Sequence, residues 1–235
     1  MKTILHFVNV KIRMGSICLE GDLNIPSGAA GLVIFAHGSG SSRLSPRNRH
    51  VARVLRRAGL ATLLLDLLTR DEEQFDQRTR KLRFDIRLLA SRLIGATDWV
   101  LKQPYLAKLP IGFFGASTGA AAALMAAPAR PNNVRAIVSR GGRPDLAHEA
   151  LLQTKAPTLL LVGEDDPIVL GLNQDAFDRL ACHSKRLQII PGATHLFEEP
   201  GALDEVARIA TAWFRKYLSH QDVGSHATEK VTRVA

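Results

Sequence analysis

The chain alternates between short apolar runs and longer segments in which apolar residues recur at helical spacing. An apolar run that stops at a turn signal is typical of a buried strand. The first two segments instead read as a pair of antiparallel strands that open the chain. On this basis the sequence predicts eight strands, within residues 3–12, 16–26, 30–38, 60–68, 109–117, 134–142, 156–166 and 185–195.

Helices are expected between these strands. The segment 45–59 has clear boundaries, because Ser45 can cap its start, Pro46 suits its first position and Gly59 suits its end. In the segment 84–103, the apolar residues at 86, 89, 93, 94, 96 and 100 fall at helical spacing. Further helices are expected at 118–130, between 166 and 185, and at 201–218.

Two antiparallel strands followed by repeated strand–helix–strand units predict an α/β fold, with a mostly parallel central sheet of about eight strands and helices on both faces. In such sheets, functional residues gather at the carboxyl ends of the strands. We expect residues 1–219 to form a single domain and residues 220–235 to form a flexible C-terminal tail. The loops expected to meet at one edge are those of Gly38, Ser117, Arg140, Asp166 and His195.

The net charge of +9 and the pI near 10.1 raise the question of nucleic-acid binding. The basic residues are spread along the chain, many of them on apparent helix patterns such as 49–59 and 78–87. No aromatic-rich binding motif accompanies them. A solvated basic surface is therefore the simpler interpretation, and no nucleic-acid partner is expected.

The sequence predicts a soluble, cytoplasmic protein without a membrane partner. No window approaches the roughly 18 apolar residues of a membrane span. Asn9, Lys11 and Arg13 interrupt the N-terminal apolar stretch before a signal-peptide core can form. Cys18 and Cys182 match no zinc spacing, and a core of this size does not need a disulfide, so both are expected to be buried free thiols.

The strand expected at 109–117 runs into Gly115-Ala116-Ser117-Thr118-Gly119, a Gly-x-Ser-x-Gly pattern. The glycines either permit a tight strand-to-helix turn or also hold Ser117 exposed as a nucleophile. Larger residues at Gly115 and Gly119 would clash with the strand and the helix, and the alanines that follow let the helix pack close to the sheet. The position between a strand and a helix favours the nucleophile, because a helix N-terminus stabilises negative charge that develops there.

A serine nucleophile needs a base, and the base needs a group that orients it. His195 follows the last predicted strand, where the base is expected, whereas His37 is expected to support its own loop by hydrogen bonding. The acid should follow the preceding strand, where the candidates are Glu164, Asp165 and Asp166. Asp166 is preferred because it lies furthest round the turn and can reach back to His195, and Asp165 is the next choice.

The glycine- and serine-rich segment 35–42 follows the third predicted strand. Backbone N–H groups in such a segment can point at an oxyanion without bulky side chains in the way. The N–H groups of Ser39 and Thr118 are the expected oxyanion hole. Chemistry of this kind requires no metal and no organic cofactor, and neither is expected.

Four segments in this order, HGSG, GASTG, GEDD before Pro167 and GATH, resemble the α/β-hydrolase superfamily over roughly residues 20–218. The short chain, without a large lid, is similar to the dienelactone hydrolase-like family. Residues 37–49, 139–146 and 191–203 resemble the hydrolase domains that some bacteria fuse to phosphoribosyltransferases. The resemblance implies the α/β-hydrolase fold and acyl hydrolysis. Dienelactone hydrolases proper use a cysteine nucleophile, so Ser117 argues against dienelactone itself as the substrate.

The sequence therefore predicts a serine hydrolase that cleaves carboxylic esters of small acyl substrates through a Ser117–His195–Asp166 triad and an acyl-enzyme. A thioesterase or small-amide hydrolase with the same triad is an alternative within the enzyme class. A non-catalytic binding protein on a hydrolase fold is the alternative outside it. The natural substrate and the oligomeric state are left open.

Arginines near the same edge of the sheet suggest that the substrate carries negative charge. They are Arg43, Arg47, Arg140 and Arg143. The planar guanidinium group suits carboxylates and phosphates. Arg140 is the preferred substrate-binding candidate because it stands where an apolar strand ends. The alternative is that Arg143 pairs with Asp145 or holds its loop and that Arg43 and Arg47 are solvated.

Overall fold

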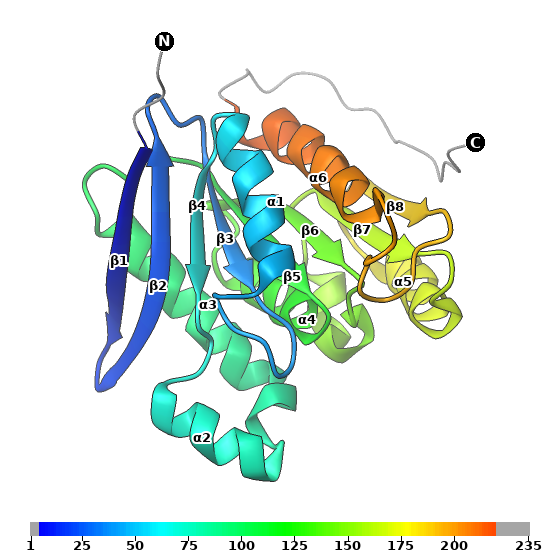
Figure 1. Ribbon diagram of the computed structural model, residues 1–235, viewed down its shortest axis with the longest axis horizontal. Helices are drawn as coiled ribbons and strands as arrows, with labels where there is room; N and C mark the ends of the chain where they lie inside the picture. The colour runs from blue at the N-terminus through cyan, green and yellow to red at the C-terminus, as the bar shows by residue number, and fades with distance from the viewer. Residues whose placement is uncertain (1–4, 220–235) are drawn as a thin grey trace.

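The computed structural model describes residues 5–219, and one eight-stranded sheet forms its centre (Figure 1). The strands are β1 (Leu5–Met14), β2 (Ile17–Pro26), β3 (Leu32–Ala36), β4 (Ala61–Leu65), β5 (Ile111–Ala116), β6 (Val134–Arg140), β7 (Thr158–Gly163) and β8 (Lys185–Ile190). Their order across the sheet is β1-β2-β4-β3-β5-β6-β7-β8. β1 and β4 both pair antiparallel with β2, and all remaining pairs are parallel.

Helices cover both faces of this sheet. The six α-helices of the described chain are α1 (Pro46–Arg57), α2 (Arg70–Thr79), α3 (Ile86–Leu101), α4 (Thr118–Ala126), α5 (Pro167–Arg179) and α6 (Ala202–Leu218). In Figure 1, α1 and α6 lie in front of the sheet, and α3, α4 and α5 lie behind it. The predicted α/β fold, with about eight strands and helices on both faces, is confirmed.

The ends of α1 follow from its sequence as predicted. The Ser45 side chain accepts a hydrogen bond from the backbone N–H of Asn48, and Pro46 occupies the first helical position. Gly59 follows the helix with a φ of +84°, a conformation that glycine adopts without strain. α1 therefore starts and stops where its capping residues dictate.

The prediction of a helical pattern across residues 78–87 is wrong. α2 ends at Thr79, Arg80 adopts a left-handed φ of 57°, and a single 3₁₀ turn (Leu82–Phe84) precedes α3. The carboxylate of Asp76 fixes this break, because it is buried and accepts hydrogen bonds from the backbone N–H groups of Leu82 and Arg83 and from Arg83 Nε.

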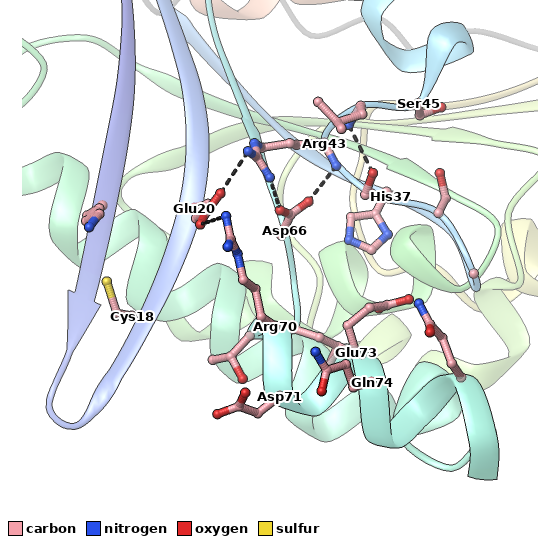
Figure 2. A pocket seen from close by; sticks show the side chains of 18 of the residues that line it. Cys18, Glu20, His37, Arg43, Ser45, Asp66, Arg70, Asp71, Glu73 and Gln74 are labelled. Atoms are coloured by element: carbon pink, nitrogen blue, oxygen red, sulfur yellow. Dashed lines mark hydrogen bonds and ion pairs between the residues drawn. The ribbon is translucent and has the colours of Figure 1, made fainter.

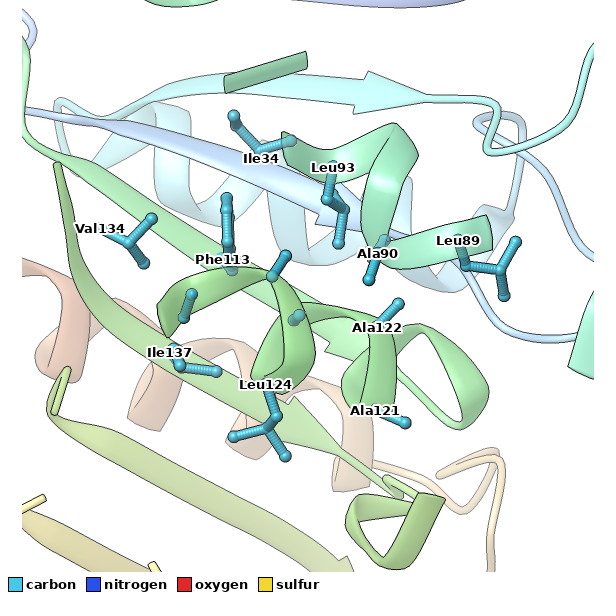
Figure 3. Close-up of a cluster of buried hydrophobic side chains, with 14 of the residues drawn as sticks. Ile34, Leu89, Ala90, Leu93, Phe113, Ala121, Ala122, Leu124, Val134 and Ile137 are labelled. Atoms are coloured by element: carbon cyan, nitrogen blue, oxygen red, sulfur yellow. The ribbon is translucent and has the colours of Figure 1, made fainter. Parts of the chain in front are cut away.

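Successive strand residues point to opposite faces of the sheet, so the chain buries two apolar layers. Behind the sheet, Phe113 and Ile137 pack with Leu93 of α3 and with alanines of α4 (Figure 3). In front of it, Phe35 and Phe114 lie with ring centroids 4.9 Å apart, in the cluster that contains Phe214 of α6. Each such large side chain contributes about 1.5–3 kcal/mol when fully buried.

Three further predictions concern membrane-spanning helices, the two cysteines and the C-terminal tail. Among residues 5–219, no helix is long and apolar enough to cross a bilayer. Cys18 and Cys182 are both free thiols, but only Cys182 is buried, and Cys18 is partly exposed. The tail expected at 220–235 lies outside the described residues.

Candidate active site

The carboxyl ends of the central strands bring the predicted loops together. Gly38, Ser117, Arg140 and His195 line one pocket of about 210 Å³. Asp166 lies against His195, with Asp166 Oδ2 2.6 Å from His195 Nδ1. The chain therefore gathers all five predicted loops at one edge of the sheet, although they are far apart in sequence.

Ser117 occupies a strained turn between β5 and α4. Its φ of 50° and ψ of −120° are rare for a residue with a side chain, and such conformations persist only where the surroundings impose them. Its N–H donates to the carbonyl of Arg140 (3.3 Å), and its own carbonyl accepts from the N–H groups of Ala120 (3.0 Å) and Arg143 (3.1 Å). These three bonds hold the backbone so that the side chain faces the pocket.

The two glycines of the Gly-x-Ser-x-Gly pattern have the steric role expected of them. A Cβ at Gly115 would lie 2.4 Å from the Cα of Ala120, and one at Gly119 would lie 2.3 Å from the carbonyl oxygen of Ala36. No real Cβ comes this close to backbone atoms. Any larger residue on either side would force the backbone around the Ser117 turn to shift.

Asp166 and His195 form a hydrogen-bonded pair. Asp166 stands at the N-cap of α5, where a carboxylate ordinarily accepts from the helix N–H groups, but it makes no such capping bond. Its Oδ2 instead lies 2.6 Å from Nδ1 of His195, which donates a hydrogen bond to the carboxylate. The Asp166 side chain is 14% exposed and the His195 side chain 38% exposed, so water reaches the imidazole more readily than the carboxylate.

The other two acidic candidates are engaged elsewhere. The Glu164 carboxylate accepts from the backbone N–H of Gly192. Asp165 is exposed and uses its backbone N–H to bond the carbonyl of Ala193 (3.0 Å). Of the three candidates, Asp166 is the one whose carboxylate meets His195.

Ser39 and Thr118, the two residues predicted to form the oxyanion hole, lie side by side. Their hydroxyl oxygens are 3.0 Å apart. Gly38 brings the loop this close, because a Cβ there would lie 3.2 Å from the Cβ of Ser117. Thr118 is also the first residue of α4, whose N-terminal end carries partial positive charge.

His37 fixes the loop that contains Ser39. His37 is 8% exposed, accepts from the N–H of Leu67 at Nε2 (3.1 Å) and lies 3.0 Å from the carbonyl of Gly38 at Nδ1. Burial lowers the pKa of His37 below its ordinary value of 6.5, so the neutral ring is favoured. His37 therefore supports the loop, as its sequence position suggested.

A larger cavity of about 930 Å³ lies beside this loop but does not include Ser117. Figure 2 shows the guanidinium group of Arg43 between Glu20 of β2 and Asp66, which follows β4. Arg43 also pairs with Asp22 at 3.3 Å. Because its charge is balanced by these carboxylates, Arg43 fastens the loop to the sheet.

The four candidate arginines separate into two pairs. Arg43 is engaged in the network just described, and Arg143 donates to both carboxylate oxygens of Asp145 at 2.8–2.9 Å. Arg47 and Arg140 line the pocket that contains Ser117. Sequence reasoning overlooked Asn48, which lines the same pocket from α1; its spacing of one residue from Arg47 offered no signal.

Comparison with known proteins identifies the family. The sequence profile of the dienelactone hydrolase family matches residues 19–219. The chain belongs to the dienelactone hydrolase family. Within this family, the crystal structure of a dienelactone hydrolase from Anabaena variabilis is 61% identical, with a TM-score of 0.89, over 91% of this chain and 99% of that one.

Two further proteins are similar to this chain, one in fold and one in sequence. The esterase domain of a Rhodothermus marinus protein shares the fold, with a TM-score of 0.72 at 20% identity over 91% of this chain and 100% of that one. A Mycobacterium tuberculosis protein named as a putative phosphoribosyl transferase is 56% identical over 209 residues. That match covers 89% of this chain but 46% of the relative, so the chain spans about half the relative's length. The chain is a member of a hydrolase family with the α/β-hydrolase fold.

Proposed function

We propose that this member of the dienelactone hydrolase family is a serine-dependent hydrolase of carboxylic esters with small acyl groups. The observation that supports it is the hydrogen-bonded pair of Asp166 and His195, in which His195 shares a pocket with Ser117. A nucleophile, a base and a group that orients the base are the three components of a serine hydrolase.

In the proposed reaction, Ser117 Oγ attacks the carbonyl carbon of the ester while His195 Nε2 accepts the hydroxyl proton. Asp166 accepts the hydrogen bond from Nδ1–H, which keeps Nε2 free as the acceptor and stabilises the imidazolium that forms. The negative charge on the carbonyl oxygen is stabilised by the N–H groups of Ser39 and Thr118.

The intermediate then expels the alcohol, which takes the proton from His195. Water attacks the remaining acyl-enzyme, again giving a proton to His195, and the carboxylic acid leaves with Ser117 restored. These steps use only side chains and backbone N–H groups of the chain and one water molecule.

Ester cleavage is preferred because relatives named dienelactone hydrolase and esterase domain share this fold. Ser117 stands where dienelactone hydrolases proper use cysteine, so the lactone itself is not proposed. The transferase name of the M. tuberculosis relative applies to a protein of which this chain matches less than half, and it assigns no reaction to Ser117. Thioesters and small amides use the same groups, and comparing kcat/KM for an ester, thioester and amide of one acyl group separates the three.

The nucleophile is tested with a fluorophosphonate probe, which phosphonylates an activated serine. We expect folded protein to gain one adduct that peptide mass mapping assigns to Ser117. Ser117→Ala should abolish labelling and lower ester turnover by about 10⁴–10⁶-fold. Ser91→Ala, on the exposed surface of α3, is the matched control and should label as the wild type does. An unlabelled Ser117 in folded, wild-type protein would exclude the proposal.

A further inference from the structure

Arg140 places an uncompensated positive charge beside the proposed nucleophile. Its side chain is buried, with the residue only 7% exposed, and it lines the pocket with Ser117 and His195. Its Nε and Nη1 have no hydrogen-bond partner among the described residues. Two buried guanidinium nitrogens whose N–H groups have no acceptor are costly, since they lose their hydrogen bonds to water.

Acidic neighbours do not balance this charge. Among the described residues, no carboxylate forms an ion pair with Arg140, and no Asp or Glu lines the pocket. Burial, together with the nearby charge of Arg47, lowers the pKa of Arg140 to about 10. The remaining neighbour is the ring of Phe197, 5.7 Å from the guanidinium carbon. A cation–π contact of this kind offsets only part of the cost of burying a charge.

Arg47 adds a further unpaired donor to the same pocket. Arg47 binds Glu198 through Nη1 at 2.8 Å, on the exposed side, but its buried Nε has no partner. Buried polar groups are nearly always hydrogen-bonded, so the unpaired donors of Arg140 and Arg47 at one pocket indicate groups that a ligand acceptor satisfies.

We propose that this pocket is an anion subsite, in which Arg140, assisted by Arg47, binds an anionic oxygen group of the ester substrate. The proposal rests on the proposed function, because it defines the substrate class of the same site. A carboxylate and a phosphate share the required chemistry, since both offer several acceptor oxygens to a planar guanidinium group. The substrate is then an ester with a negatively charged group close enough to the scissile carbonyl to share a pocket of about 210 Å³.

The first experiment compares kcat/KM for aryl esters of matched size, one with a neutral acyl group and one with a carboxylate at the end of the acyl chain. The wild type should prefer the anionic ester. Arg140→Met should lower the ratio of the two values by roughly 10–100-fold, the range expected for a charge-assisted hydrogen bond. Arg143→Met, which removes a paired arginine from the same loop, should leave the ratio unchanged. A wild type without preference, or an Arg140→Met variant that keeps it, would overturn the proposal.

The second experiment does not depend on turnover. Ser117→Ala protein is titrated with succinate and with inorganic phosphate, and binding is followed by calorimetry. If an anion binds and its binding disappears when Arg140→Met is added, the result supports the subsite and identifies the anion that it prefers. Absence of binding by both would refute the subsite even if esterase activity is present. Binding without any esterase activity would retain the subsite and reject the proposed function.

A structural role for Arg140 makes a different prediction about stability. Methionine has similar length and no charge, and replacing an unpaired buried ion by an apolar residue is often neutral or stabilising. Arg140→Met should therefore unfold at or above the wild-type Tm. A clear fall in Tm with unchanged substrate preference would show that Arg140 holds the fold and does not bind substrate. Arg140→Lys keeps the charge without the planar fork and should show an intermediate preference if Arg140→Met does not fold.

Discussion

Substituting Gly119 with alanine tests the close approach of α4 to β3, the strand that precedes the loop of Ser39. The new Cβ would lie 2.3 Å from the carbonyl oxygen of Ala36 and 2.4 Å from that of His37. Both are backbone atoms at the end of a central strand, and they cannot rotate away as a side chain does. Relief requires α4 and β3 to separate by about 0.7 Å or more, to reach the 3.0 Å limit of real contacts.

Two opposing contributions decide the sign of the effect. Alanine favours a helix over glycine by about 1 kcal/mol. Overpacking of a closely packed interior costs typically 1–3 kcal/mol and sometimes more. Because the contact here involves two rigid carbonyl groups, we expect the steric cost to exceed the helical gain, leaving a net loss of about 1–3 kcal/mol. For a chain of this size that corresponds to a fall in Tm of roughly 2–12 °C.

The same shift should damage activity, because α4 supplies Thr118 and β3 leads to Ser39. Losing one oxyanion donor costs about 10²–10³-fold in kcat, so a partial displacement should lower kcat by about 10-fold or more with a smaller change in KM. Thermal unfolding and steady-state kinetics on the same preparation measure both effects.

Gly171→Ala is the matched control. Gly171 lies in the exposed part of α5, and a Cβ there meets no atom within 4 Å. This variant should be more stable by about 0.5–1 kcal/mol, since only the helical gain remains. If Gly119→Ala matched Gly171→Ala in stability and the wild type in turnover, the steric account of the Gly-x-Ser-x-Gly turn would be wrong.

Two further predictions concern the acid and the loop histidine. Asp166→Asn should lower ester turnover by a factor on the order of 10⁴, through loss of the correct imidazole tautomer, whereas Asp165→Asn should have a far smaller effect; reversed effects would assign the acid to Asp165. Because burial lowers the pKa of His37 below 6.5, the unfolded chain binds a proton before the folded one does, so the free energy of unfolding should fall as the pH drops below about 6.5, by up to about 1.4 kcal/mol per pH unit. Urea unfolding at several pH values measures this slope, and an unchanged slope in His37→Gln would show that His37 does not contribute to it.

The alternation of apolar runs with helical patterns was enough to predict the strand order along the chain and the edge at which the functional loops meet. It was insufficient for α2, whose apolar positions do not repeat. That helix depends on a capping box between Thr69 and Glu72, a local signal, and on the buried carboxylate of Asp76. A short polar helix of this kind is recognised by its caps and not by its hydrophobic pattern.

The roles of the arginines could not be read from sequence for a different reason. Arg43 is balanced by Glu20, Asp22 and Asp66, which come from other strands and loops. Arg140 lacks such partners only because no acidic residue from another loop reaches it. Whether a charged side chain is paired depends on residues that are distant in sequence and close in the fold. The position of Ser117 on its turn depends on the glycines next to it in the sequence, so it could be predicted.

The arrangement of α1 and α6 on the same face also governs when the chain can fold during synthesis. α1 ends at Arg57, but its neighbour α6 is complete only at Leu218, which lies so close to Gly31 that a Cβ added to this glycine would be 2.7 Å from the Cβ of Leu218. Until α6 emerges, the apolar side chains of β5, β6 and β7 that face it stay open to water. Contacts between segments so distant in sequence form slowly, and exposed apolar surface favours aggregation in the meantime. The nascent chain is therefore most exposed to aggregation in the interval before α6 packs against the sheet.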